Sequence, residues 1–193
     1  MSYADEQILK LREEEKKKQF NTLETGIYIG GDILCFERRA ILNTLSLSLP
    51  YTMTVMPIEF ARIKYPSEFR PQVILTTPEL DVNLGFTLLT DVFGGIDLEE
   101  LADRMMNMIK RVYPDYRIYP GKRLKHLEGY FFSFRSHALD SDLYNMTLVM
   151  KIKDRLLQGS FNCLYKQHTE WRKIVLMMWE TIQEWEEEEE CVL

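Results

Sequence analysis

The side chains best suited to catalysis or metal binding are few in this chain and lie far apart. The three histidines, His126, His137 and His168, fall on separate expected elements. Neither a His-Glu-x-x-His helix nor a Cys-x-x-Cys pair, either of which would bring two ligands to one metal ion, occurs in the sequence. The sequence therefore predicts no bound metal ion and no cofactor.

The cysteines give the same indication. Cys35, Cys163 and Cys191 are odd in number and widely spaced, which is typical of free thiols in a reducing compartment. Cys163 could act as a nucleophile beside a histidine, but its place in an alternating strand is typical of a buried, unreactive thiol. With no nucleophile, base or ligand cluster at plausible spacing, we predict that the protein is not an enzyme.

A glycine pair precedes a helix start, where free backbone amides can bind phosphate. Gly94 and Gly95 come just before Asp97, which opens a capping-box pattern with Glu100. The carboxylates of Asp97, Glu99 and Glu100 occupy that position and would repel an anion. We therefore interpret the glycines as a flexible loop.

One segment reverses the acidic character of the chain, whose formal net charge is -6. A solvated helix end and turn explains its cations, which also favour the helix dipole; an acidic protein partner is the alternative. Nucleic acid is not expected, because aromatic and basic residues do not interleave there. The charge of the segment is opposite to that of Glu186 to Glu190, which it could meet across a dimer. Its residues are Lys110, Arg111, Arg117, Lys122, Arg123 and Lys125.

The segment from Lys64 to Pro71 is the best candidate for a recognition loop. Pro66 and Pro71 restrict it, so exposed side chains are held in place at a low entropic cost. A structural turn is the plainer interpretation. If the loop binds a partner, we expect the contacts from side chains of types enriched in binding hot spots: Tyr65, Phe69 and Arg70.

The composition bounds the organisation that must position these residues. With 193 residues, 46% of them hydrophobic, the chain can bury one sizeable core. We expect a charged helix over residues 1–22, a single α+β domain over 23–186 and an acidic tail over 187–193. No run of 18 apolar residues or signal-peptide pattern is present, which predicts a cytoplasmic protein without membrane insertion.

Within the domain, the first half predicts an alternation of short elements. Gly30-Gly31-Asp32 predicts a hairpin turn between strands over 26–29 and 33–36. Leu45, Leu47 and Leu49 alternate with serines and predict a strand with one buried face. A short helix over 58–63, strands over 72–76 and 82–90, and an amphipathic helix from Asp97 to Val112 follow. A short strand over 117–119 and a turn at Pro120-Gly121 complete this half.

The last third predicts the fold class most clearly. Alternating stretches over 128–138, 142–153 and 155–165 predict an antiparallel meander, and 168–186 predicts a helix on it. Leu176, Met177 and Trp179 make this helix wider in apolar surface than one sheet needs. We interpret them as partner-binding candidates unless a second layer from the N-terminal region covers them.

This order of elements, from the Leu-Ser-Leu-Ser-Leu-Pro strand at Leu45 to the helix opening His168-Thr169-Glu170-Trp171, resembles the PsbP-like fold. The resemblance implies an α/β/α sandwich with a central antiparallel sheet flanked by helices, here with an added N-terminal helix. It extends to the Mog-like and DcrB-related bacterial proteins, and implies a role in binding other proteins, including the chaperoning of secretion effectors.

The sequence therefore favours a non-enzymatic module that binds another protein or itself, such as an adaptor or a secretion chaperone in a bacterium. Two alternatives stay open. One is a small-molecule binder with a pocket between the sheet and a helix, and the other is a homodimeric structural protein.

Overall fold

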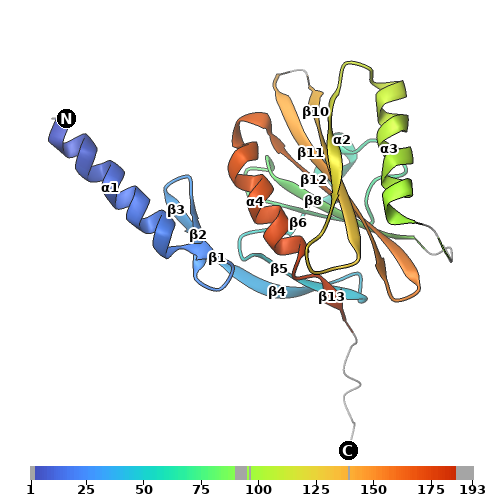
Figure 1. The fold of residues 1–193 in the computed structure, drawn as a ribbon, viewed down its shortest axis with the longest axis horizontal. Helices are drawn as coiled ribbons and strands as arrows, with labels where there is room; N and C mark the ends of the chain where they lie inside the picture. The colour runs from blue at the N-terminus through green and yellow to red at the C-terminus, as the bar shows by residue number, and fades with distance from the viewer. Residues whose placement is uncertain (1–2, 90–94, 96, 139, 186–193) are drawn as a thin grey trace, which may run out of the picture.

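A seven-stranded antiparallel sheet forms the centre of the protein (Figure 1). The computed structural model describes residues 3–89, 95, 97–138 and 140–185, so Gly94, Cys191 and the expected tail over 187–193 lie outside it. The predicted α+β class with a helix-flanked antiparallel sheet is confirmed. In spatial order the strands are β6 (Thr54–Val55), β7 (Val73–Thr76), β8 (Asn83–Leu89), β12 (Arg155–Leu164), β11 (Asp142–Ile152), β10 (Gly129–His137) and β9 (Arg117–Arg123).

The predicted meander is confirmed as β10, β11 and β12. Its register pairs Met146 of β11 with Ser133 on one side and Phe161 on the other. Because successive side chains of a strand face opposite ways, Met146 and Leu148 enter one core cluster while Val149 enters another. The sheet is therefore buried on both faces at its centre.

One face carries helix α4 (His168–Trp179), reached through the short 3₁₀ turn η1 (Tyr165–Gln167). A small sheet of β4 (Phe36–Ile41), β5 (Leu45–Pro50) and β13 (Gln183–Glu184) joins the same core. The three leucines of β5 are buried as predicted. Ser46 is also fully buried, contrary to the expected open face, and its hydroxyl is satisfied by accepting a hydrogen bond of 2.9 Å from Arg38.

Helix α4 ends at Trp179, earlier than the predicted residue 186. The backbone N–H and the hydroxyl of Thr181 both donate to the Met178 carbonyl, at 3.0 and 2.7 Å. This turn leads the chain into β13, where Gln183 pairs with Ser46. The prediction for Trp179 was wrong: its side chain is 0% exposed, with its ring 6.4 Å from that of Phe131.

The other face carries helices α3 (Leu98–Val112) and α2 (Ile58–Lys64). The carboxylate of Asp97 caps α3 by accepting from the Glu99 and Glu100 amides at 2.8 and 3.1 Å. Glu100 pairs with Arg104 instead of completing the predicted capping box. The buried side of α3 is also shorter than predicted, since Val112 is 59% exposed.

The N-terminal residues form an arm, and Figure 1 shows α1 (Tyr3–Gln19) projecting from the body. Side chains 5–19 are all exposed. A small sheet of β1 (Asn21–Thr22), β2 (Gly26–Ile29) and β3 (Asp32–Leu34) follows. Gly30 and Gly31, at φ 62° and 99°, form the predicted turn, which requires positive φ at both positions. The inner side of this sheet packs on the main core through Ile27, Ile29 and Leu34.

The edge strand β9 is longer than predicted. Pro120 and Gly121, expected as a turn, lie inside it, where the register to β10 shifts between Phe131 and Ser133. A Cβ on Gly121 would lie 2.2 Å from the Tyr130 ring, so glycine lets that ring pack across the edge. Proline and a bulge both make an edge strand a poor template for pairing with another chain.

Candidate functional site

The sheet face that carries α3 is divided into an apolar part and a polar part. Helix α3 packs on Tyr130, Phe132 and Val149. Beyond it, a group of uncharged polar side chains lies on this face, where Asn145 pairs with Asn162 and Thr147 pairs with Ser160 in the register. We call this polar part the floor, made of Thr87, Asn145, Thr147, Gln158, Ser160 and Asn162.

The last residue of α2 and the loop that follows it, residues 64–72, lie over one side of the floor, and we call this segment the strap. Its seat depends on Gly85, where a Cβ would lie 2.6 Å from both Pro71 Cγ and Ser160 Oγ. The Gln72 side chain holds the end of the strap by bonding to both the N–H and the carbonyl of Leu88, at 3.0 and 3.3 Å. The strap is therefore fastened to β8.

The strap is also ordered within itself. The Ser67 hydroxyl accepts from the Phe69 amide at 3.1 Å, and the Ser67 carbonyl accepts from the Arg70 amide at 3.2 Å. This turn leaves the Phe69 side chain 96% exposed. A large aromatic side chain is thus presented to solvent by an ordered loop.

Between the strap and the floor lies a groove with a volume of about 730 Å³. Leu89 and Phe134, which also contact the α3 cluster, add apolar surface to its lining. The predicted recognition residues Tyr65, Phe69 and Arg70 all line this groove. The structure therefore gathers them at one site, and their role in binding stays a prediction.

A chain of hydrogen bonds joins the strap to the interior of the sheet. Thr76 Oγ1 donates to Asn83 Oδ1 at 2.7 Å, and Asn83 Nδ2 donates to Asn162 Oδ1 at 2.9 Å. Asn162 Nδ2 then donates to the Tyr65 hydroxyl at 2.8 Å. Burial raises the pKa of Tyr65 while the bond from Asn162 opposes that effect, so the phenol is neutral at physiological pH.

The other predicted binding residues do not join this site. Leu176 and Trp179 belong to the core on the opposite face of the sheet, and Met177 is half-buried on the same helix. The β4–β5–β13 sheet and the inner side of the β1–β3 sheet pack against that core as well. Trp179 is fully buried in this core and is therefore inaccessible to a partner.

The floor residues were missed at the sequence level. Their signal is the alternation of amide and hydroxyl residues with buried apolar ones, as in Asn145-Met146-Thr147 and Ser160-Phe161-Asn162. The apolar half of this alternation predicts the buried core, and the polar half marks the floor. The uncharged floor offers hydrogen-bond donors and acceptors but no group that titrates near neutral pH.

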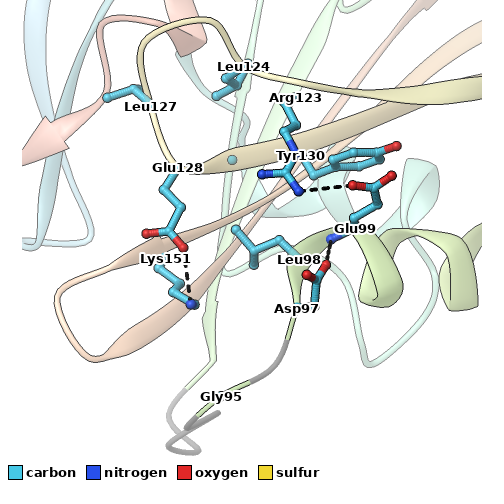
Figure 2. Close-up of a pocket in the computed structure, with 11 residues that line it drawn as sticks. Gly95, Asp97, Leu98, Glu99, Arg123, Leu124, Leu127, Glu128, Tyr130 and Lys151 are labelled. Atoms are coloured by element: carbon cyan, nitrogen blue, oxygen red, sulfur yellow. Dashed lines mark hydrogen bonds and ion pairs between the residues drawn. The ribbon is translucent and has the colours of Figure 1, made fainter.

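A second, smaller hollow of about 310 Å³ lies at the start of α3 (Figure 2). Arg123 pairs with Glu99 at 3.1 Å, and Lys151 pairs with Glu128 at 3.2 Å. Asp97 takes up the helix amides, as the sequence predicted. The charges are therefore paired with one another, and Arg123 of the basic segment is part of that pairing.

Cys35, Cys163 and the three histidines do not line the groove. Cys163 is buried, which raises its pKa to about 12, while Cys35 is exposed. His137 contacts Asp142 at 2.6 Å, and His168 contacts the Tyr165 carbonyl at 2.6 Å. Within the described ranges, no three His, Cys, Asp or Glu side chains lie together where they could hold a metal ion.

No protein family model matches the chain, and no curated protein matches it. Solved structures do. PsbP of the cyanobacterium Synechocystis sp. PCC 6803 (CyanoP) is 10% identical over 83% of this chain and 98% of that one, with a TM-score of 0.57. The chain has a PsbP-like fold. The Saccharomyces cerevisiae Ran-binding protein Mog1p is 8% identical over 78% of this chain and 95% of that one, with a TM-score of 0.54.

The predicted resemblance is therefore confirmed at the level of the PsbP-like and Mog-like fold, while membership of the DcrB-related family stays a prediction. Among the helices of the described part of the chain, none has the length and apolar character needed to cross a membrane.

Proposed function

We propose that this chain is a non-enzymatic protein-binding module and that the groove between the strap and the floor receives a segment of the partner protein. The observation that carries the proposal is Phe69, which is 96% exposed on an ordered strap beside an uncharged polar floor. Aromatic side chains held this way are typical of binding hot spots.

The chemistry of the floor favours a polypeptide. Amide and hydroxyl side chains can both donate and accept, as peptide groups do. Leu89 and Phe134 beside them offer contacts to an apolar side chain of the same segment. Mog1p, which shares the fold, is a Ran-binding protein, and this supports a protein partner for the present chain.

The charges at the groove favour binding over catalysis. The lining residues that carry a charge, Lys64, Glu68 and Arg70, sit on the strap. The floor itself supplies neither a nucleophile with an adjacent base nor a general acid. We infer a role in holding a partner segment, as an adaptor or a chaperone does, with a secretion effector as one candidate partner.

Copurification with matched variants tests the proposal. Tagged wild-type protein, Phe69→Ser and Tyr51→Ser are each recovered from the native cell, and bound proteins are quantified by mass spectrometry. Tyr51 is a suitable control because it is an exposed aromatic residue that does not line the groove. We expect Phe69→Ser to lose a specific partner at least about tenfold while Tyr51→Ser retains it. Equal recovery with all three proteins would overturn the proposal.

We further place the module in the cytoplasm of a bacterium, and the exposed thiol of Cys35 supports a reducing compartment. Fractionation of the native cell tests this placement. Recovery in the periplasm or another oxidising compartment would contradict it.

A homodimer is the second candidate, and a separate observation favours it. Four large apolar side chains are exposed on β6 and α2: Val55, Ile58, Phe60 and Ile63. Light scattering across a dilution series tests the homodimer, because a monomer at micromolar concentration is incompatible with a stable dimer.

A neutral small molecule bound in the groove would instead appear by native mass spectrometry of the purified protein.

A further inference from the structure

The hydrogen-bond chain beneath the strap has a direction. Each asparagine accepts through its oxygen from the preceding residue and donates through its nitrogen to the next, so the chain runs from Thr76 through Asn83 and Asn162 to Tyr65. Asn83 Nδ2 also faces the Leu80 carbonyl at 3.4 Å, which fixes the orientation of that amide. The chain therefore ends at the groove.

At this end, one hydrogen is left over. The Tyr65 oxygen accepts from Asn162, so the hydroxyl hydrogen is not used in the chain. Within the described part of the molecule, no group accepts it. Hydrogen bonds that point the same way polarise one another, so the last hydroxyl of such a chain is a strengthened donor.

A free acceptor lies on the neighbouring strand. Asn145 lines the groove and is the register partner of Asn162. Its nitrogen donates to Ser136 Oγ at 2.8 Å, which leaves Oδ1 as an acceptor that no described donor uses. The groove thus offers a hydroxyl donor from Tyr65 and an amide acceptor from Asn145.

We propose that Tyr65 is a specificity-determining residue that donates a hydrogen bond to a backbone carbonyl oxygen of the bound segment, while Asn145 accepts from a backbone N–H of that segment. This inference rests on the proposed function. Regular helices and strands use these backbone groups internally, so the occupant is a polypeptide segment in an extended, unpaired conformation.

The charge of the floor further defines the occupant. All six floor side chains are uncharged, so an ionised side chain lying on them would lose water without gaining a counter-charge. The side chains of the segment that face the floor are therefore neutral. An apolar side chain of the same segment packs on Phe69 at the rim.

The test uses synthetic decapeptides without helix-forming sequences, in neutral, acidic and basic sets, and measures their binding by fluorescence polarisation. Site-specific 3-fluorotyrosine at position 65 makes the phenol a stronger donor and a weaker acceptor. Relative to the wild type, we expect the best neutral peptide to bind the 3-fluorotyrosine protein about twofold more tightly. We expect the same peptide to bind Tyr65→Phe about three- to tenfold more weakly than it binds the wild type. Weaker binding or no change with 3-fluorotyrosine would overturn the assignment of Tyr65 as the donor.

Two controls separate this role from a structural one. Fluorination of Tyr51, which is 70% exposed and does not line the groove, leaves the affinity unchanged. Thr76→Val breaks the far end of the chain but keeps the Tyr65 hydroxyl, so it weakens binding less than Tyr65→Phe does. Equal losses in Thr76→Val and Tyr65→Phe would show a structural effect and contradict the inference.

The binding measurements distinguish a failure of the Tyr65 inference from a failure of the proposed function. If Phe69→Ser abolishes peptide binding while Tyr65→Phe binds as the wild type does, the groove is the site and the Tyr65 inference is wrong. If no decapeptide binds the wild type, or if Phe69→Ser binds equally well, the proposed function fails and the inference falls with it.

Discussion

Asn162 of β12 donates a hydrogen bond of 2.8 Å to the hydroxyl of Tyr65, although the two residues lie 97 positions apart in the chain. This contact ties the strap to the central sheet and places Tyr65 at the wall of the groove. Loss of this hydrogen bond is expected to lower the stability of the protein as well as its binding.

Tyr65→Phe is expected to lower the free energy of unfolding by about 0.5 to 1.5 kcal/mol, because the partly buried Asn162 amide loses its acceptor. Urea denaturation followed by tryptophan fluorescence measures the loss. Tyr51→Phe is the control, since the Tyr51 side chain is 70% exposed, and it should unfold as the wild type does. Equal stability of the two variants would contradict a stabilising role for this hydrogen bond.

Gly85→Ala is expected to displace the strap, because the new Cβ would lie 2.6 Å from Pro71 Cγ. Overpacking of this kind costs about 1 to 3 kcal/mol. Gly159→Ala provides the comparison, since its Cβ would meet Leu148 at 3.2 Å and needs a smaller adjustment. Urea denaturation and limited proteolysis within residues 64–72 should affect Gly85→Ala more, and the reverse order would argue against a strap seated on Gly85.

Trp179→Ala is expected to cost about 3 to 5 kcal/mol, because removing a fully buried ring leaves a cavity in the core. Met177→Ala, on the same helix but half-buried, should cost clearly less. Thermal unfolding of both variants makes the comparison. A small loss for Trp179→Ala would restore this residue as a surface contact.

The thiols should differ in reactivity. Cys163 has its pKa raised to about 12 by burial, so it should react with a disulfide reagent at pH 8 only after unfolding, whereas Cys35 reacts at once. Cys191→Ser removes the remaining thiol from the assay. Rapid labelling of a second thiol in folded Cys191→Ser would contradict the burial of Cys163.

The same shift predicts a pH dependence of stability. The unfolded thiol ionises near pH 9 and the folded one near 12, so the stabilising difference is complete below 9 and declines as pH rises above it. Between pH 8 and 10 the wild type should lose about 1 kcal/mol more than Cys163→Ala. Identical losses would show that Cys163 ionises in the folded protein.

Local patterns were sufficient to predict most elements of the fold. The alternation in 142–153 gave β11, the two glycines at 30 and 31 gave the hairpin, and Asp97 gave the start of α3. Each of these signals arises within a few residues. The end of α4 could not be predicted this way, because it depends on Gln183 pairing with Ser46 of a distant strand.

Only the part of the candidate site that depends on local sequence signals could be predicted. Two prolines marked the strap, and with it Tyr65, Phe69 and Arg70. The floor depends on which part of the sheet face α3 leaves uncovered, which is a matter of packing between segments far apart in the chain. Trp179 shows the reverse case, since the apolar width of its helix indicated a free surface, whereas its side chain is fully buried in the core beside Phe131.

Photo-crosslinking at the strap tests most directly the claim that the groove binds a protein. The photoreactive residue p-benzoylphenylalanine replaces Phe69 in one protein and Tyr51 in another, and each is irradiated in the native cell. We expect a discrete protein adduct from position 69 that is absent from position 51, with the crosslinked peptide mapping to one extended segment of the partner. Identical adduct patterns from the two positions, or no protein adduct from position 69, would contradict the claim.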